Sequence, residues 1–409
     1  MKQLLLITIE LPFPANSGGR IKSWNMIKAL SEHYEVSVVS PLKYGSDLVD
    51  NFKKSISIEK LYSSEVVKER SARNLLTSYL QQVPLNVYRS QSDVLRRTVA
   101  DIADQFDIIL LDHYEAFQYL PKDYKGKVIL HTHNATYLMW ERYAIQGDSL
   151  AMRLAARLEA FRVKRYERRA CNSADLIFAA PNDIDNLCKL GCSREKFKET
   201  YHLGDDSQLL LKELSFDSTE EQLFYVGTLS WEANVDGLLW FFEEIWPQLK
   251  QKRPSLKFLI AGSKPDQRLI EAAKTLKDIE LLGYVEDLEP YFKSSRLFIA
   301  PLRFGAGIKV KVLNTMCRGL PIVTTSVGAE GLAVKNFEHM AIADNAEDTC
   351  TAIEQLLDDP AAWQLIRDES RNIIRAKYTW KRVLGDMISE LHILINKSQR
   401  PTVVTDERR

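Results

Sequence analysis

The sequence has no excess of charge of either sign, and it contains few cysteines. Its 55 lysines and arginines equal its 55 aspartates and glutamates. A chain without net charge has no overall field that recruits nucleic acid, so we expect no nucleic-acid partner and only local anion binding. The five cysteines are odd in number, and the one pair spaced by four residues lacks a second pair that could complete a zinc site. We therefore expect no zinc site, and reduced thiols in a cytosolic protein are typical of this pattern.

Long hydrophobic runs are also missing. None reaches the roughly 18 apolar residues that a membrane-spanning helix needs. The apolar stretch Leu4 to Ile9 follows a single lysine, and Glu10 and Pro12 interrupt it too early for the core of a signal peptide. We therefore expect this stretch to be a buried strand. We expect the protein to be cytoplasmic, either soluble or resting on the inner face of the membrane.

Short apolar runs alternate with helical patterns along the whole chain. Most runs are continuously apolar, as strands covered on both faces are, and this alternation predicts parallel sheets built by right-handed crossovers. The expected strands are Leu4–Ile9, Val36–Val39, Ile56–Leu61, Ile108–Leu111, Val128–Leu130, Leu176–Ala179, Leu223–Val226, Leu256–Ala261, Ile279–Leu282, Leu297–Ala300, Ile322–Thr325 and Met340–Ile342. The expected helices include Ile21–Leu30, Val94–Gln105, Val235–Lys250 and Ala346–Leu357.

A polar, acidic segment from Asp205 to Glu221 interrupts this pattern once. With 409 residues the chain is long enough for two domains, and we place their junction there. We predict an α/β fold of two doubly wound Rossmann-like domains, residues 1–205 and 206–379, that face a central cleft. A helix at about 380–396 is expected to pack back on the first domain, and the tail 397–409 to be disordered. In such sheets ligands bind at the carboxyl ends of the strands.

The most informative segment runs from Pro301 to Asn314. An apolar strand leads into a turn with Gly305 and Gly307, and a helix carrying Lys309 and Lys311 follows. Glycines let the backbone approach a ligand closely, and a helix start presents unpaired N–H groups and partial positive charge. Together with the lysines these features predict a phosphate site. The alternative is an ordinary turn between a strand and a helix.

The first domain offers two weaker candidates at strand ends. Gly18 and Gly19 precede a helix expected near Ile21, where they either expose backbone N–H groups to a ligand or form a plain turn. His133 follows a strand together with His131, and a histidine there could donate to a developing charge or a sugar hydroxyl. For His133 we favour a functional role. For His131 and for His113, at the end of a neighbouring strand, we favour a structural one.

Three loops of the second domain follow strands in the same way. Gly227 and Thr228 could line the site beside the phosphates, although Asn234 or Ser230 could equally cap the next helix. Tyr284 and Val285 lie where a nucleotide base could bind. Glu330, between two glycines, could accept hydrogen bonds from ribose or sugar hydroxyls, or be a solvated loop carboxylate.

A basic helix is expected from Ala151 to Ala170. Leu154, Leu158 and Phe161 share one face with arginines at helical spacing. We favour a surface helix whose charge is balanced by Glu159 and Glu167. The alternative is attraction to an anionic membrane face or a lipid-phosphate acceptor.

With these residues identified, the chain resembles the family 4 glycosyltransferases, the "group 1" retaining enzymes with the two-domain GT-B fold. The likeness spans nearly the whole chain and is most specific from Phe224 to Leu332. Its second-domain motifs are GTLSWEANVD at 227–236, GYVED at 283–287, PLR at 301–303 with GAG at 305–307, and GLPIV at 319–323. In the first domain they are PFP at 12–14 with Gly18 and Gly19, and His133 with Asn134.

The resemblance implies a nucleotide-diphosphate sugar, such as a UDP-sugar, as co-substrate without a further cofactor or a metal. It places Lys309 and Lys311 on the diphosphate and His133 on the donor sugar. The other donor-binding residues would be Gly18, Gly19, Gly227, Thr228, Tyr284, Val285, Gly305, Gly307, Ile308, Asn314 and Glu330. The acceptor would be a saccharide or a lipid-linked saccharide, as in cell-surface polysaccharide biosynthesis, with peripheral contact at the inner membrane face.

Two positions depart from the family pattern. Its paired glutamates map onto Ala306 and Asn314, and the second glutamate usually binds the ribose hydroxyls. We expect weaker ribose binding, with Glu330 taking part of that role. The departures leave open a catalytically silent protein that binds a nucleotide sugar. A sugar-nucleotide epimerase of the same architecture is the other alternative, although the first domain shows no convincing pair of acid–base carboxylates.

Overall fold

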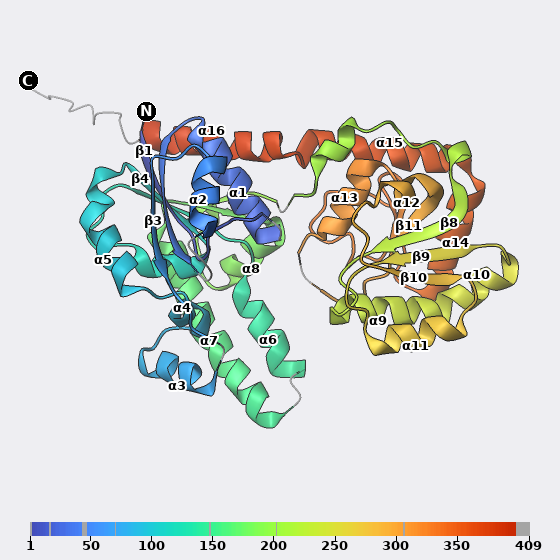
Figure 1. Ribbon diagram of the computed structural model, residues 1–409, viewed down its shortest axis with the longest axis horizontal. Helices are drawn as coiled ribbons and strands as arrows, with labels where there is room; N and C mark the ends of the chain where they lie inside the picture. Colours follow the sequence, from blue (N-terminus) through green and yellow to red (C-terminus); the bar gives the residue numbers. More distant parts are fainter. Residues whose placement is uncertain are drawn as a thin grey trace, which may run out of the picture. The chain divides into compact units, whose positions relative to one another are not determined.

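The computed structural model describes residues 2–15, 18–42, 47–69, 71–146, 149–201, 203–305 and 307–397 (Figure 1). The chain divides into two compact units. Unit 1 contains Met1–Tyr201 and the chain from Val383 onward, and unit 2 contains His202–Arg382. Ala306 and the tail after Lys397 lie outside the described residues.

Unit 1 is built on a sheet in the order β3-β2-β1-β4-β5-β6-β7, and its neighbouring strands pair in parallel. The strands are β1 (Gln3–Ile7), β2 (Glu35–Leu42), β3 (Lys60–Glu65), β4 (Ile108–Asp112), β5 (Lys127–His131), β6 (Leu176–Ala179) and β7 (Phe197–Glu199). In β1, an interior strand of the sheet, Leu4 lies opposite Val36 on one side and Ile108 on the other. The predicted parallel α/β architecture is confirmed for this unit.

Helices cover both faces of this sheet, which explains why its strands are continuously apolar. The helices of the unit are α1 (Gly18–Ser31), α2 (Asp47–Ser55), α3 (Ala72–Leu80), α4 (Leu85–Arg89), α5 (Asp93–Ile102), α6 (Thr136–Gln146), α7 (Leu150–Ser173), α8 (Pro181–Lys189) and, from the end of the chain, α16 (Trp380–Lys397). Leu5 and Ile7 of β1 enter a core shared with α5, α7 and α8. Leu4 and Leu6 enter a second core shared with α1, α2 and α16, which therefore packs on unit 1.

Unit 2 has a parallel sheet in the order β10-β9-β8-β11-β12-β13. Its strands are β8 (Glu220–Val226), β9 (Lys257–Ala261), β10 (Ile279–Gly283), β11 (Ser295–Ala300), β12 (Ile322–Thr324) and β13 (Ala341–Ile342). Its helices are α9 (Glu232–Trp240), α10 (Trp246–Lys252), α11 (Gln267–Thr275), α12 (Glu289–Ser294), α13 (Val310–Arg318), α14 (Ala346–Asp358) and α15 (Pro360–Lys377). In Figure 1, α9, α10 and α11 lie on one face of this sheet, and α12 and α13 lie on the other. This unit too is Rossmann-like, as predicted.

The structure differs from the expected elements in a few places. The third strand begins at Lys60 rather than at Ile56, because α2 continues to Ser55 and Ile56 is then buried in the adjoining core. The helix expected over Val235–Lys250 is divided by a π-helical stretch, Phe241–Ile245. Strand β7 was not among the expected strands. The units join at residues 201 and 202, a few residues before the expected junction.

Parallel pairing brings the carboxyl ends of the strands to one edge of each sheet. The loops after β8, β10, β11 and β12 therefore leave unit 2 at a common edge, and these loops carry the predicted donor-binding residues of this unit. Among the described helices, none combines the length and the apolar character required to cross a bilayer.

Candidate functional site

The glycine turn after β11 leads to the lysine pair, as the sequence predicted, but only Lys311 lies within the following helix. Gly305 has φ 146° and Gly307 has φ 71°, backbone conformations that favour glycine. Helix α13 begins at Val310, so Lys309 is its N-cap residue and Lys311 lies in its first turn. The two lysines therefore flank a helix N-terminus, where unpaired N–H groups and the helix dipole favour an anion.

Lys311 is held by hydrogen bonds inside unit 2. Its Nζ donates to Oη of Tyr225 at 2.7 Å and to Oδ1 of Asn234 at 2.5 Å. The amine also lies 4.5 Å from the centre of the Tyr225 ring, in a cation–π contact. The side chain thus links α13 to β8 and α9. Burial and, secondarily, repulsion by Lys309 lower the pKa of Lys311 to about 7.

Gly227 and Thr228 lie in the same cluster as Lys311. A Cβ atom on Gly227 would stand 2.7 Å from Oη of Tyr225, so this position has no room for a larger residue. The Thr228 carbonyl accepts a hydrogen bond from Nδ2 of Asn234 at 2.8 Å. Asn234 therefore does not cap α9, whose N-cap residue is Trp231. The suggested capping role for Asn234 was wrong, because its amide binds the Thr228 loop and the lysine.

Lys309 and Glu330 come together from two different loops. The Lys309 amine donates to the Gly307 carbonyl and lies 3.4 Å from Oε2 of Glu330. The Lys309 side chain is almost fully buried, and that of Glu330 is 35% exposed. Ile308 is packed against the same loop, since a Cβ atom on Gly331 would stand 2.8 Å from Cγ1 of Ile308. Glu330 thus contacts a predicted phosphate-binding lysine instead of being only a solvated carboxylate.

Tyr284 and Val285 follow β10 at the same edge of the sheet. The preceding Gly283 has φ 71°, and its carbonyl accepts a hydrogen bond from the Gly262 N–H at 2.8 Å. Tyr284 is 77% exposed and presents a ring to solvent. Its position suits stacking on a base, but no contact of the described residues joins it to Lys311.

Asn314 is placed differently from the ribose-binding role that the resemblance implies. Its Oδ1 accepts a hydrogen bond from the backbone N–H of Asp205 at 2.7 Å. A Cβ atom on Gly204 would stand 2.3 Å from the same oxygen, so the two segments are in close contact. The Asn314 side chain thus anchors the start of unit 2. Ala306, the other departure from the family pattern, lies outside the described residues.

In unit 1 the predicted His133 belongs to a buried polar cluster centred on Asp112, the last residue of β4. Oδ1 of Asp112 lies 2.7 Å from Nδ1 of His131 and 2.8 Å from Nε2 of His133. The Ser23 hydroxyl donates to the other carboxylate oxygen. His113 stacks on His133 with ring centres 3.6 Å apart.

The histidines lie closer together than the separate roles expected for them suggested. Residues two apart in extended backbone point to the same side, and His131 and His133 accordingly reach the same carboxylate oxygen. His131 and His113 also share the cluster of His133. Asp112, Ser23 and Lys22 were missed in the sequence. The position of Asp112 at a strand end was the available signal, whereas Ser23 and Lys22 lie within α1 and gave none.

Burial sets the charges of this cluster. It lowers the pKa of His131 and of His133 to about 4 and that of His113 to about 3, so the rings are neutral near pH 7. For Asp112 burial alone would raise the pKa, but the charges and hydrogen bonds of His133 and His131 hold it well below its usual range. Asp112 is therefore an anion that accepts N–H bonds from two neutral imidazoles.

Helix α1 forms one wall of this cluster. It begins at Gly18, so Gly18 and Gly19 belong to its first turn rather than to a preceding loop. A Cβ atom on Gly19 would stand 3.7 Å from Nδ1 of His133, which places the helix start beside that ring. Burial lowers the pKa of Lys22, one turn further along the helix, to about 8, against an opposing effect of the Asp112 charge.

A metal could approach only one set of side chains among the described residues, namely Asp112, His113 and His133, whose ligand atoms lie within 4.8 Å of one another. The two imidazoles are stacked at an interplanar angle of 21° rather than converging on a point. Oδ1 of Asp112 is also engaged by two ring nitrogens. This geometry fits a hydrogen-bonded network better than a set of metal ligands.

Comparison with known proteins found a family model that matches part of unit 2. Residues 220–359, most of unit 2, match the family model described as glycosyl transferases group 1. A curated relative, an uncharacterized 44.6 kDa protein in the cps region of Klebsiella pneumoniae, is 23% identical over 404 residues. That alignment covers 95% of this chain and 100% of the relative.

Solved structures resemble the whole chain. Sucrose-phosphate synthase from Thermosynechococcus elongatus has a TM-score of 0.66 at 14% identity, covering 97% of this chain and 100% of its own. Anabaena HepE in complex with UDP has a TM-score of 0.64 at 12% identity, covering 96% and 100%. The chain therefore has the GT-B fold, and within it residues 220–359 are similar to the glycosyl transferases of group 1.

Proposed function

We propose that this protein is a metal-independent retaining glycosyltransferase of family 4. It would transfer a hexosyl or related sugar from a nucleotide-diphosphate donor to a saccharide or lipid-linked acceptor. The observation that carries the proposal is the lysine pair at the start of α13. Two largely buried amines stand beside unpaired N–H groups at the edge of a parallel sheet, within the segment that matches the group 1 family.

The proposed chemistry needs no protein nucleophile. The bond between the sugar C1 and the diphosphate oxygen breaks while the acceptor hydroxyl oxygen bonds to C1 on the face that the diphosphate leaves. The proton of that hydroxyl passes to a phosphate oxygen of the departing diphosphate. Lys309, Lys311 and the helix N–H groups stabilise the negative charge that builds up on the leaving group, more in the transition state than in the ground state.

We extend the proposal to the remaining site residues. Tyr284 would stack on the base, and Glu330 would accept hydrogen bonds from a sugar or ribose hydroxyl. His133 would contact the donor sugar, and Gly18 and Gly19 would let a helix start approach the phosphates. The cps-region relative supports a role in polysaccharide biosynthesis. We place that role at the inner face of the cytoplasmic membrane as part of the proposal.

One observation favours a second candidate, a binding protein without transferase activity. The Lys311 amine already has two hydrogen-bond partners, and the Asn314 oxygen is engaged by Asp205. A diphosphate must compete with Tyr225 and Asn234 for the amine. Binding of a nucleotide sugar without any nucleotide release, across a broad acceptor panel, would support this candidate. An epimerase would instead convert a UDP-sugar to a new sugar nucleotide in the absence of acceptor.

The test begins with a thermal-shift screen of UDP-, GDP- and ADP-sugars, followed by transfer assays with the donor that stabilises the protein. We expect a product whose anomeric configuration, read by NMR, matches that of the donor. Activity should persist after EDTA treatment. Failure of every nucleotide to bind would contradict the proposal, and inversion at C1 would contradict its retaining mechanism.

A further inference from the structure

The outward face of α7 carries apolar side chains where a surface helix normally carries polar ones. Leu150, Leu154, Leu158 and Phe161 follow one another at spacings of four, four and three residues. They are 74%, 50%, 57% and 65% exposed, respectively. We call these four residues the α7 stripe. The stripe is not exposed because α7 packs loosely on unit 1, since Val163 and Ala170 on the opposite side of the helix are fully buried.

Positive charge surrounds the stripe. Helix α7 contains seven basic residues, and Arg153, Arg157, Arg165, Arg168 and Arg169 among them are exposed. Its two acidic residues, Glu159 and Glu167, are each only 1% exposed. The expectation that these glutamates balance the surface charge of the helix was therefore wrong.

Both glutamates bind groups inside the unit. Glu159 accepts a hydrogen bond from the Leu85 N–H and pairs with Arg162 at 2.6 Å. Glu167 accepts bonds from the N–H groups of Thr136 and Tyr137, at the start of α6. The exposed face of the helix is consequently both apolar and cationic.

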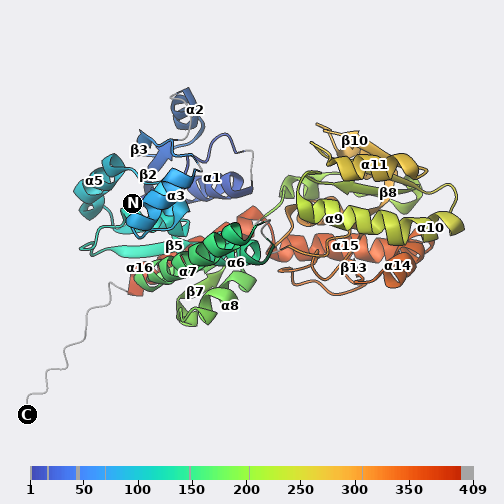
Figure 2. The ribbon, with the colours of Figure 1, turned by 90° about the horizontal axis from the view of Figure 1, so that it is seen from below.

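Neighbouring helices extend this face. The end of α3 is fixed to α7 because Arg162 donates to the Ser78 carbonyl at 2.6 Å. Leu76 and Leu80 of α3 are 62% and 77% exposed, and Ile145 at the end of α6 is 73% exposed. Figures 1 and 2 both show α3, α6 and α7 at the same end of unit 1.

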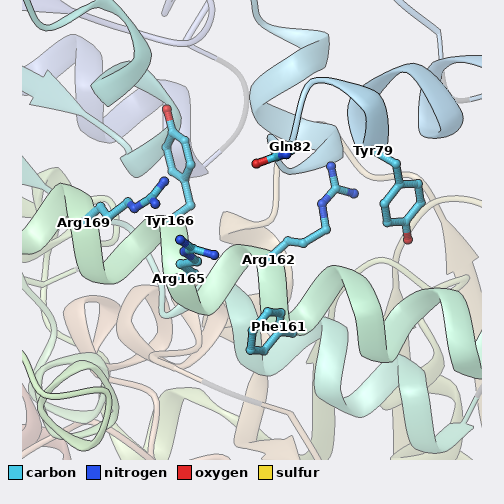
Figure 3. A pocket seen from close by; sticks show the side chains of 7 residues that line it. All are labelled: Tyr79, Gln82, Phe161, Arg162, Arg165, Tyr166 and Arg169. Carbon is cyan, nitrogen blue, oxygen red and sulfur yellow. The ribbon is translucent and has the colours of Figure 1, made fainter.

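A hollow of about 240 Å³ lies between α7 and the end of α3. In Figure 3, Arg162 reaches from α7 toward Tyr79 and Gln82, and Arg169 lies beside Tyr166. Arg162 is engaged by its internal partners, whereas Arg165 and Arg169 are exposed at the same hollow. The hollow has room for a phosphate-sized headgroup with guanidinium groups on its wall.

We propose that the α7 stripe and the arginines beside it dock unit 1 on an anionic membrane surface. Apolar side chains that enter the acyl boundary, next to arginines that meet lipid phosphates, are what such a surface recognises. Within the described residues of α6 and α7, the acidic side chain outside the core is Glu141, which is paired with Lys164. Charge complementarity therefore favours an anionic partner, and the exposed apolar stripe between the arginines favours a bilayer, whose acyl boundary accepts such side chains. The inference rests on the proposed function in one respect, since it makes a membrane the source of the acceptor.

The test is co-flotation of the full-length protein with vesicles of phosphatidylcholine alone or with about 30 mol% phosphatidylglycerol, which gives the surface a negative potential. We expect binding to the anionic vesicles only. Replacing Arg157 and Arg165 by Gln should weaken it roughly 30-fold, since one basic residue near such a surface contributes roughly fivefold. Leu154→Gln with Leu158→Gln should weaken it at least as much. Matched controls on another helix of unit 1, Arg97→Gln and Val94→Gln on α5, should bind as the wild type does.

Three results would overturn the proposal. The first is failure of the wild type to bind anionic vesicles. The second is loss of binding in the arginine variant but not in the leucine variant, because that outcome describes a site for soluble polyanions. The third is a dimer that the leucine variant converts to a monomer. Vesicle binding needs no catalysis, so its failure and the failure of the proposed transferase activity are observed separately.

Discussion

Nε2 of His133 lies 2.8 Å from Oδ1 of Asp112. Because the carboxylate is ionised and can only accept, the neutral ring must carry its proton on Nε2. Nδ1, the nitrogen beside Gly19, is then the acceptor. Asp112 thereby selects both the orientation and the tautomer of the histidine that we place next to the donor sugar.

Replacing Asp112 by Asn should therefore impair His133 without removing it. An amide can donate to the ring and favour the other tautomer, so we expect kcat for transfer to fall roughly 10²-fold. Ser23→Ala, which removes the bond to the other carboxylate oxygen, should have a smaller effect. Steady-state kinetics with matched thermal melts would check this. Equal losses in both variants would indicate a general packing defect instead.

Lys311→Met should remove most transferase activity and leave the fold intact. Methionine keeps an unbranched side chain in the space beside Tyr225 but supplies no charge to the leaving diphosphate. Losing one such donor typically costs ~10²–10³ in rate. Lys293→Met, an exposed lysine on α12, is the matched control and should retain full activity. Turnover of Lys311→Met close to that of the wild type would remove the phosphate role of this residue.

The pKa of about 7 for Lys311 has a consequence for nucleotide binding. Above that pH the amine is mostly neutral, and a bound diphosphate should raise its pKa again, so binding at pH 8 should take up a proton. Affinity for UDP should accordingly fall as the pH rises above about 7. Calorimetry in Tris and in HEPES, which differ in ionisation enthalpy, would measure the uptake. Lys311→Met should abolish it, and an unchanged uptake in that variant would assign the proton elsewhere.

The buried histidines should make the protein sensitive to acid. Their pKa values in the folded state are about 3 to 4, against 6.5 for an unperturbed histidine. The unfolded chain therefore binds more protons than the folded one as the pH falls from 6.5 toward 4, and the free energy of unfolding should fall with it. Denaturant titrations at pH 7, 6 and 5 would show the decline. His113→Asn should reduce its steepness, and a stability independent of pH in this range would contradict the assigned charges.

Most of the fold could be predicted from the sequence, because continuously apolar runs alternating with helical patterns have few other solutions. The lysine pair and its glycine turn could also be predicted, since the strand, the glycines and the lysines follow one another directly in the chain. The sequence does not show which residues form hydrogen bonds with each other when they are distant in the chain. Asn234 appeared to be a helix cap, and only the three-dimensional structure shows its amide between Lys311 and Thr228.

The same limit explains the errors in unit 1 and on α7. Asp112 forms hydrogen bonds with two histidines that are 19 and 21 residues away in the sequence. The pairing of β4 with β5 brings these histidines next to its carboxylate. Glu159 and Glu167 read as surface charges because composition does not show which side of a helix faces the core. Their partners, at Leu85 and at Thr136, lie on elements distant in the sequence.

The C-terminal helix α16 shares a core with the first strand of the chain, where Leu391 is buried in the same cluster as Leu4 and Leu6. During translation, unit 2 is complete before the ribosome has made the residues that close this core. The N-terminal half must therefore wait, with one face of its sheet only partly covered, until the last segment emerges. A premature stop that removes only α16 would leave every predicted site residue in place and still deprive unit 1 of part of its interior.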